Sequence, residues 1–435
     1  MIENVQNFVA NEIKIDSRII EQDDIFIAIN KGHDYVLEAV ESGAIMAIID
    51  NVNYFVPEKT LLVANTTEAL KLIGNYVKNA VNLKKLIAIT GSVGKTTTKC
   101  WLSSILSKKF ETYCSVKNYN TIYGIPLSLC HMNQKTDYGV FEIGSNHRGE
   151  ISELSNYLSP DIGIITNIYE SHIGNFKDKA DLVDEKISII EGIKSGGSLI
   201  YNGDSEFADK IAKQARYKNL NSFSVGFGKN CDFSIISYEK TINLRTPDGI
   251  VEYSINFDEK HLVYTSALLV AVIYSLGLKI QDFLPDFNAF SKIEGRGNIE
   301  KFTIDNKTFE IIDDCYNASP TAVMVALDNL NKMPNNNKIA IIGQMKELGN
   351  YENYYHQLVA DKINSLDIDD VFFIGEKKLW KIMNSIKKIK CFEKIDQFAM
   401  DNILKIIKND CIVLLKGSRS VGLERFVEYL RCSII

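Results

Sequence analysis

The segment LIAITGSVGKTTT, residues 86–98, has the residue types and spacing of a phosphate-binding loop. Its two glycines permit backbone angles that a side chain would forbid, so the loop amides are able to face an anion. Lys95 supplies a point charge for the β and γ phosphates of a nucleotide, and Thr96 supplies a hydroxyl ligand for Mg²⁺. The residues predicted to bind nucleotide here are Gly91, Ser92, Val93, Gly94, Lys95, Thr96 and Thr97.

The spacing of this loop, G-x-x-G-K-T, is two residues shorter than the general pattern G-x-x-x-x-G-K-[ST]. The apolar run 86–89 before it predicts a buried strand, and the following helix adds the partial positive charge of its N-terminus. A strand-to-helix turn without a ligand is the alternative. It leaves the run Lys-Thr-Thr-Thr unexplained.

Three more residues have types suited to a metal-phosphate site: Glu142, His172 and Lys186. Glu142 closes an apolar run, and His172 follows the strand predicted at 162–167. Open α/β sheets bind ligands at the carboxyl ends of their strands, so both side chains are expected near the loop. Taken singly, each residue has a plainer interpretation: a solvated glutamate, a structural histidine, and an exposed lysine on an acidic helix.

A chain of 435 residues exceeds a single core, so two or three domains are expected, and the pattern along the chain divides the elements into three units. Residues 1–82 predict a small α/β unit. Residues 83–297 alternate strands and helices, which is typical of a mostly parallel sheet, with an antiparallel insertion between about 217 and 257. Residues 298–435 predict a second, Rossmann-like parallel sheet. The apolar segment 264–276 is too short to span a bilayer and predicts a buried helix.

The composition excludes several classes of protein. A net charge of -6 argues against a general nucleic-acid or membrane-surface binder, which usually has a basic excess. The eight cysteines form no C-x-x-C pair, which indicates neither a zinc site nor a disulfide framework. The N-terminal residues have no basic region followed by an apolar core, so no secretory signal is expected. We expect a cytoplasmic monomer without membrane insertion.

Short motifs along the whole chain resemble those of the Mur ligases. The segments ITGSVGKTTTK, NYNTIYGIPLSL, FEIGSNHRGEI, TNIYESHIGNF, DDCYNASP and LLKGSR occur in that family's order and at its distances. The N-terminal segment IDSRIIEQDDIFIAINKGHDY is similar to the D-S-R and G-H-D-F elements of its UDP-sugar domain. The resemblance implies a three-domain α/β enzyme. Residues 1–82 would bind a UDP-muramoyl substrate, residues 83–297 would bind ATP, and residues 298–435 would bind an incoming dipeptide.

The resemblance also implies the reaction, a step of peptidoglycan precursor synthesis. ATP phosphorylates the carboxylate of a UDP-N-acetylmuramoyl tripeptide, the amine of D-alanyl-D-alanine attacks the acyl phosphate, and the tetrahedral intermediate collapses to an amide, ADP and phosphate. A carboxylate is a poor electrophile because its leaving group is oxide. The catalyst must therefore supply positioning and charge neutralisation, for which two Mg²⁺ ions are suited.

The resemblance assigns roles to the metal-site residues. Thr96 and Glu142 would hold the Mg²⁺ that bridges the β and γ phosphates, while His172 and Lys186 would serve the second Mg²⁺. The matching lysine of Mur ligases is carbamylated, which turns a cation into a carboxylate-like ligand. Lys186 is therefore expected to be carbamylated. The predicted catalytic set is Lys95, Glu142, His172 and Lys186.

The remaining site residues come from the same motifs. Those expected to contact the nucleotide are His261 by the adenine, Arg296 near phosphate, Asp314 near ribose, and Asn317. Those expected to contact substrate are Ser17 and Arg18 at the UDP, Asn118 and Asn120 near the reacting phosphate, and Lys416 and Arg419. An arginine binds a carboxylate in bidentate fashion, so Arg419 is predicted to lie by the dipeptide's C-terminal carboxylate.

Five positions depart from the family's pattern. Ser188 stands at the third position of the usual K-x-E, and Ser319 stands where Asn is common. Glu259 and Thr265 replace the glycine and asparagine of a G-x-H-x-x-x-N element, and Gln344 replaces the Asp of G-D-M-x-E-L-G. These departures put a supporting carboxylate near Lys186 and one polar adenine contact in doubt.

The sequence is also compatible with other functions. A sibling Mur ligase that adds L-Lys or diaminopimelate, or a folylpolyglutamate synthase, would share most of these motifs. A P-loop kinase or NTPase would share the loop, and a non-enzymatic scaffold would not need Glu142, His172 and Lys186 together. The motifs DDCYNASP and NYNTIYGIP favour the member that adds the dipeptide.

Overall fold

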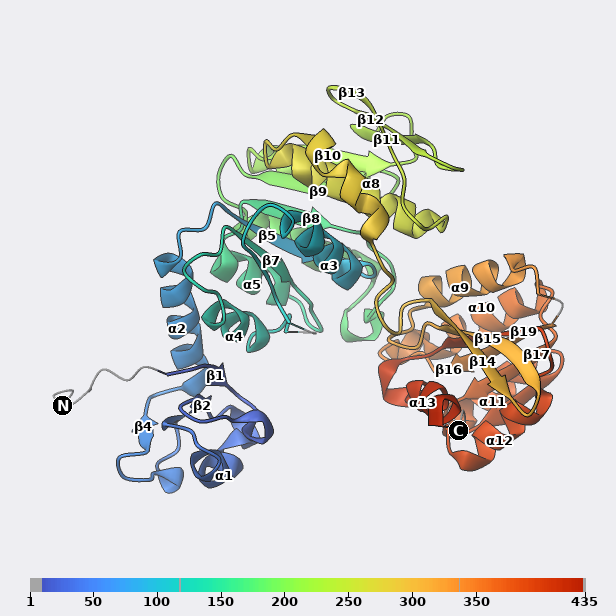
Figure 1. Cartoon of the computed structure of the whole chain (residues 1–435), viewed down its shortest axis with the longest axis horizontal. Coiled ribbons are helices and arrows are strands. Elements are labelled where there is room, and N and C mark those ends of the chain that lie inside the picture. Colours follow the sequence, from blue (N-terminus) through green and yellow to red (C-terminus); the bar gives the residue numbers. More distant parts are fainter. Residues whose placement is uncertain (1–9, 117–118, 336, 433–435) are drawn as a thin grey trace.

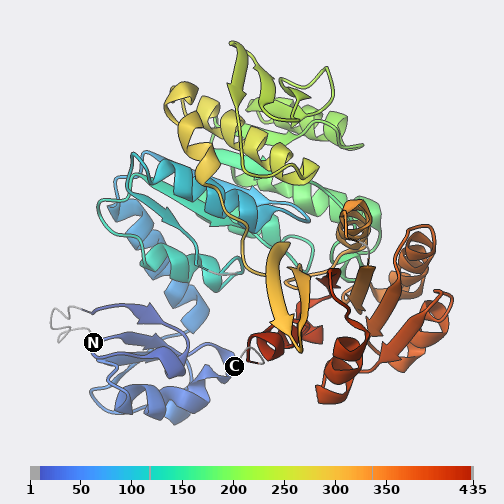
Figure 2. The same cartoon turned by 45° about the vertical axis from the view of Figure 1, so that its right-hand side comes forward.

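The structure is a computed structural model that describes residues 10–116, 119–335 and 337–432. It contains three bodies, each built on its own β-sheet (Figure 1). In Figure 1 the N-terminal body and the C-terminal body lie at different ends of the middle one, and Figure 2 shows both of them below it. The predicted α/β architecture with three sheet-based units is confirmed.

The N-terminal body has a four-stranded parallel sheet in the order β1-β2-β3-β4. Its elements are β1 (Ile13–Lys14), β2 (Ile25–Ile27), α1 (Val36–Glu41), β3 (Met46–Ile49), β4 (Thr60–Leu62) and α2 (Thr66–Ala80). The side chain of Asn65 accepts a hydrogen bond from the Glu68 N–H and so caps the start of α2. Helix α2 packs against α4 (Gly124–Cys130) and thereby joins this body to the middle one.

The middle body has a nine-stranded sheet in the order β13-β12-β11-β10-β9-β8-β5-β7-β6. Its strands are β5 (Lys85–Thr90), β6 (Thr112–Cys114), β7 (Tyr138–Glu142), β8 (Ile162–Ile165), β9 (Ser198–Asn202), β10 (Asn221–Gly226), β11 (Phe233–Ser237), β12 (Ile242–Thr246) and β13 (Gly249–Tyr253). Strands β11, β12 and β13 pair antiparallel and the others parallel. Of the segment predicted to be antiparallel, about 217–257, only β11 to β13 pair in that way and extend the main sheet, whereas β10 pairs parallel with β9 and β11.

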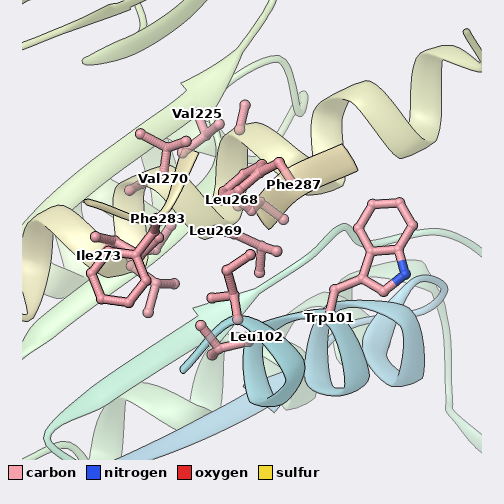
Figure 3. Packing of buried hydrophobic residues seen from close by; sticks show 14 of the residues in the cluster. Trp101, Leu102, Val225, Leu268, Leu269, Val270, Ile273, Phe283 and Phe287 are labelled. Carbon is pink, nitrogen blue, oxygen red and sulfur yellow. The ribbon is translucent and has the colours of Figure 1, made fainter. Parts of the chain in front are cut away.

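Helices cover both faces of this sheet. They are α3 (Lys95–Leu106), α4, α5 (Glu150–Leu158), α6 (Lys179–Ile187), α7 (Ala208–Tyr217) and α8 (Lys260–Ser275). Figure 3 shows α3 and α8 packing through Leu102, Leu268 and Leu269. Helix α8 is the predicted buried helix, apolar on all sides. Among the described helices, none has the length and apolar character that crossing a membrane requires.

A stack of three aromatic rings fixes the exit of the chain from this body. The Trp101 ring lies 4.4 Å from Phe290 and 5.8 Å from Phe257, measured between ring centres, and is nearly parallel to both. Its indole N–H donates to the Ser291 carbonyl at 2.8 Å. The segment leading to Arg296 is therefore anchored on α3, the helix that follows the phosphate loop.

The C-terminal body has a six-stranded sheet in the order β14-β15-β19-β16-β17-β18. Its elements are β14 (Asn298–Ile304), β15 (Lys307–Asp313), α9 (Pro320–Lys332), β16 (Asn337–Gly343), α10 (Glu352–Asn364), β17 (Asp370–Ile374), α11 (Lys377–Met383), β18 (Ile389–Phe392), α12 (Gln397–Ile406), β19 (Cys411–Lys416) and α13 (Glu424–Cys432). Five of its strands are parallel, as predicted. At the edge, β14 pairs antiparallel with β15 because Asp305 and Asn306, both at positive φ, make a tight hairpin turn.

All eight cysteines are free thiols.

Candidate active site

The turn between β5 and α3 has the backbone that the loop sequence predicts. Gly91 has a φ of 139°, and a Cβ there would lie 2.1 Å from the hydroxyl of Thr166, so a side chain has no room. Gly94 has a φ of 82° and immediately precedes α3. The Val93 N–H donates to the side chain of Asn167 at 2.9 Å, which fixes the loop on the end of β8. The turn therefore presents the N-terminus of α3 to the cleft between the middle and C-terminal bodies.

Lys95 folds back over this turn. Its ammonium donates to the Gly91 carbonyl at 2.8 Å, and burial lowers its pKa, although Glu142 opposes that shift. Ser92 before this lysine and Thr97 after it are both buried. The Lys95 ammonium and the N-terminus of α3 thus lie together at the end of the loop.

Glu142 ends β7, the neighbour of β5, and is 4% exposed. One carboxylate oxygen accepts from the Thr96 hydroxyl at 2.9 Å, and the other accepts from the Asn120 amide at 2.9 Å. The Arg296 guanidinium donates to the Thr96 hydroxyl at 2.9 Å from the segment leading to the C-terminal body. The structure therefore brings the predicted residues Thr96, Asn120, Glu142 and Arg296 together. Asn118 lies outside the described residues.

Arg296 has unused hydrogen-bonding capacity in this position. Its Nε–H is buried and has no acceptor among the described residues. Because a buried charged donor without a partner is costly, the guanidinium suits an anionic ligand beside Thr96. This observation fits a nucleotide phosphate at the loop.

Lys186 is buried on α6, with 1% of its surface exposed. Its ammonium donates to the Ser145 hydroxyl at 2.9 Å. Burial, with a smaller contribution from the charge of Lys95, lowers the pKa of Lys186 to about 7. The interpretation of Lys186 as an ordinary exposed lysine is wrong, because α6 turns this residue toward the sheet. The lowered pKa favours the neutral amine.

His172 reaches the same cleft from the loop after β8. It immediately precedes the 3₁₀ turn η4 (Ile173–Asn175) and has a positive φ of 62°. Its Nδ1 lies in close contact with the carboxylate of Glu347, which belongs to the C-terminal body, but has no hydrogen-bond partner among the described residues. Sequence reasoning missed this contact and also Ser145, although both partners stand inside the motifs KELG and FEIGSN.

The oxygen atoms of Thr96 and Glu142 fit one of the two Mg²⁺ ions that the family resemblance implies. Thr96 and Glu142 supply adjacent oxygen ligands, which Mg²⁺ prefers. In the described part of the chain, no three His, Cys, Asp or Glu side chains converge on a metal-sized space. His172 and an unmodified Lys186 are nitrogen donors and suit Mg²⁺ less well. Carbamylation would give Lys186 the oxygen ligands that the second ion requires.

These residues line a cleft of about 1490 Å³ between the middle and C-terminal bodies. His261 contributes from the start of α8, and Asp314, Asn317 and Lys416 contribute from the C-terminal body. The Lys416 ammonium pairs with the Asp314 carboxylate at 3.0 Å and donates to the Asn317 carbonyl at 2.5 Å. Lys416 therefore holds the DDCYNASP loop in place over the cleft. Its direct contact with substrate stays a prediction.

Two arginines lie over the ring of Tyr316 in that loop. The guanidinium carbon is 4.3 Å from the ring centre for Arg296 and 5.8 Å for Arg419. Arg419 is outside the residues that line the cleft, its side chain is 62% exposed, and it pairs with Glu424. Arg419 therefore lies next to the DDCYNASP loop, and its guanidinium is open to solvent.

The predicted UDP contacts lie in the N-terminal body, apart from this cleft. Ser17 is buried and lies 3.4 Å from a carboxylate oxygen of Glu38, while the exposed Arg18 pairs with Asp16. They do not line the cleft that contains the phosphate loop. A substrate that touches both places must be long, as a nucleotide-linked sugar peptide is.

Each departure from the family's pattern has a local partner in the structure. The pairs are Ser188 with the Glu185 carbonyl, Glu259 with Lys292, Thr265 with the His261 carbonyl, Ser319 with the Ala322 N–H, and Gln344 with Glu352 and Glu376. All five side chains therefore have a hydrogen-bond or ion-pair partner in the structure.

Comparison with known proteins agrees with this geometry. The family described as Mur ligase middle domain matches residues 89–273, and the one described as Mur ligase, glutamate ligase domain, matches residues 300–419. MurF from Acinetobacter baumannii is 28% identical, with a TM-score of 0.86 over 96% of this chain and 93% of that one. The MurF ligase of Thermotoga maritima in complex with ADP has a TM-score of 0.83 over 98% and 99% of the two chains. At 24% identity it shows the shared fold.

The UDP-N-acetylmuramoyl-tripeptide–D-alanyl-D-alanine ligase of Rickettsia prowazekii is 32% identical over 435 aligned residues, which cover 96% of this chain and 95% of that protein. Counterparts with the same name in other bacteria, including Bacillus subtilis at 27% identity, match over nearly as much of their length. The likeness therefore includes all three bodies and the cleft. This chain belongs to the Mur ligase family.

Proposed function

We propose that this chain is an ATP-dependent ligase that adds D-alanyl-D-alanine to a UDP-N-acetylmuramoyl tripeptide in peptidoglycan synthesis. The observation that carries the proposal is the cleft between the middle and C-terminal bodies, where Lys95, Glu142 and Arg296 meet at the end of the phosphate loop. Full-length relatives that carry this activity in their names support the same choice.

The chain's own residues account for the activation of the carboxylate. The N-terminus of α3 and the Lys95 ammonium would hold the β and γ phosphates, and the Arg296 Nε–H would take a phosphate oxygen as its acceptor. Thr96 and Glu142 would hold one Mg²⁺, and His172 with a carbamylated Lys186 would hold another. When bound, Mg²⁺ neutralises phosphate charge and so favours attack on the γ phosphorus.

The three bodies would divide the substrates among them. The N-terminal body, within residues 1–82, would bind the UDP end through Ser17 and Arg18. Residues 83–297 would bind ATP, and residues 298–435 would bind the dipeptide, with Arg419 on its terminal carboxylate. This division agrees with the sheets, which occupy residues 13–62, 85–253 and 298–416.

Isotope transfer tests the proposed route. The tripeptide substrate is prepared with ¹⁸O in its terminal carboxylate and incubated with ATP, Mg²⁺ and D-alanyl-D-alanine. If the carboxylate oxygen attacks phosphorus, each phosphate released carries one ¹⁸O. Unlabelled phosphate would mean that water attacks ATP directly, as in an NTPase, and would refute the proposal.

A further inference from the structure

The end of β8 lies directly against the phosphate loop. A Cβ on Gly91 would lie 2.1 Å from the Thr166 hydroxyl and 3.0 Å from the Asn167 carbonyl oxygen. The Ser92 N–H donates to that same carbonyl at 3.0 Å. The absence of a side chain at Gly91 therefore lets residues 166 and 167 approach the backbone of the loop.

The carboxamide of Asn167 holds both polar backbone groups of Val93, which lies between the two glycines of the loop. Its Oδ1 accepts the Val93 N–H at 2.9 Å, and its Nδ2 donates to the Val93 carbonyl at 3.1 Å. A carboxamide suits this pair of groups because it offers an acceptor and a donor side by side. The Thr166 hydroxyl donates to the same carbonyl at 2.7 Å. Two side chains thus fix the peptide units on either side of Val93.

This arrangement determines where the next amide of the loop points. The C=O of Val93 and the N–H of Gly94 belong to one peptide unit, and in a trans peptide they point in opposite directions. The Gly94 N–H therefore points away from the end of β8. Among the described residues it has no backbone acceptor, and both Val93 and Gly94 line the cleft.

We infer that Asn167 is a positioning residue for the nucleotide: it holds the backbone of Val93 so that the Gly94 N–H faces a phosphate oxygen. Gly94 has a φ of 82°, and the backbone of a glycine rotates readily, so this amide needs its neighbours to fix it. A preorganised amide binds an anion more tightly, because less ordering remains to be done on binding. The inference rests on the proposed function for the nucleotide that supplies the phosphate, whereas the contacts of Asn167 do not.

The test is the affinity of Asn167→Ala for ADP, measured by calorimetry at a temperature where circular dichroism shows that the variant is folded. The Kd should rise at least about tenfold, because hydrogen bonds that order the loop are lost. Asn156→Ala, which removes an exposed carboxamide from α5, is the control and should bind ADP as the wild type does. A folded Asn167→Ala with the wild-type Kd would overturn the inference.

Adenosine separates positioning of the loop from damage to the whole cleft. It has no phosphate, so its Kd should stay near the wild-type value in Asn167→Ala. An equal loss of affinity for adenosine and ADP would reduce Asn167 to a structural residue and refute its role at the phosphate.

A second pair of variants tests the same carbonyl from Thr166. Thr166→Val removes one of the two side-chain donors to the Val93 carbonyl and should weaken ADP binding, whereas Thr166→Ser keeps the hydroxyl and should recover most of the affinity. Equal ADP affinity in Thr166→Val and the wild type would contradict the inferred orientation. ADP binding needs no turnover, so a wild-type chain that shows these dependences yet forms no amide would refute the ligase and leave the role of Asn167 intact.

Discussion

The end of the cleft at the phosphate loop brings together the basic side chains of Lys95, Lys186 and Arg296 and the carboxylate of Glu142. Lys95 donates to the backbone of the phosphate loop, Lys186 is buried, and Glu142 is hydrogen-bonded to Thr96. An excess of positive charge suits a triphosphate. Burial, with a smaller contribution from the charge of Lys95, lowers the pKa of Lys186 to about 7 and favours the neutral amine.

Lys186→Ala should lower turnover by about 100-fold or more, because it would remove a ligand that neutralises transition-state charge. Short-chain carboxylates should restore part of the activity by occupying the space of the carbamate, and bicarbonate should raise wild-type activity. Steady-state phosphate release measures each effect. The exposed Lys177→Ala, next to α6, is the matched control and should behave as wild type. If neither carboxylates nor bicarbonate has an effect, carbamylation loses its support.

Arg419→Ala should raise the KM for D-alanyl-D-alanine about tenfold or more, because a guanidinium pairs with a carboxylate in bidentate fashion. The KM for ATP should change less. Initial rates at varied dipeptide concentration measure both. Arg425→Ala, three residues beyond Gly422, serves as the control. A KM for dipeptide equal to the wild-type value would show that Arg419 binds something else.

Some of these side chains could be placed from the sequence and others could not. Glu142 was predictable because it ends a strand beside the loop strand, and parallel strands bring their ends together. The burial of Lys186 was not, because an acidic helix gives no sign of which face turns inward. The contact of Glu347 with His172 joins two bodies, and local patterns carry no information about such a contact.

At the scale of elements, the turn between β5 and α3 is the part that tolerates least change. Its two glycines are needed for different reasons. A Cβ on Gly91 would collide with Thr166 and the backbone of Asn167. A Cβ on Gly94 would meet open space, so the only constraint there is the positive φ of the backbone.

The two glycine variants should therefore differ in stability. Gly94→Ala should lower the free energy of unfolding by about 1–2 kcal/mol, the cost of a left-handed alanine. Gly91→Ala should cost more, because Thr166 and Asn167 must also shift. Thermal unfolding of the two purified variants ranks them, and ADP binding should weaken in both. Equal stability of the two variants would mean that the loop adapts around Gly91.

The loop after β16 depends on a buried histidine. His356 on α10 accepts the Met345 N–H at Nε2, at 3.1 Å, and its Nδ1 lies 2.8 Å from the Glu352 carbonyl. Burial lowers the pKa of His356 below its usual 6.5. Between that lowered value and 6.5, the unfolded chain binds more protons than the folded one. The contribution of His356 to the free energy of unfolding is therefore fully present above pH 6.5, and it is lost as the pH falls through the lowered pKa.

Replacing His356 tests this pH dependence. His356→Gln should cost about 1–3 kcal/mol at pH 7.5, because the Met345 N–H loses a buried acceptor. Its unfolding midpoint should then change less between pH 7.5 and 5.5 than that of the wild type. The exposed His147→Gln is the control and should keep the wild-type dependence. An identical pH dependence in wild type and His356→Gln would contradict the assignment.

The elements were predictable in proportion to their apolar content. The strands β5, β7 and β16 are buried along most of their length and stand out in the sequence. Strand β14 is harder to recognise in the sequence, because its residues alternate between buried and solvent-facing at the edge of the sheet. Strand β18 spans four residues without a continuous apolar run.

At the scale of the whole molecule, the active cleft exists only because two bodies meet. The phosphate loop and Glu142 come from the middle body, while Asp314, Asn317 and Lys416 come from the C-terminal one. The aromatic stack at Trp101 ties the connecting segment to the helix after the loop. Nucleotide binding and the position of the C-terminal body are therefore physically linked.

The most direct test of the ligase is phosphate release from ATP with a UDP-N-acetylmuramoyl tripeptide and a choice of acceptors. D-alanyl-D-alanine, L-lysine, diaminopimelate and buffer alone are offered separately. We predict release with D-alanyl-D-alanine only, together with a new amide product. Release without any acceptor would indicate an NTPase, and release with a single amino acid would indicate a sibling ligase; either result would contradict the account.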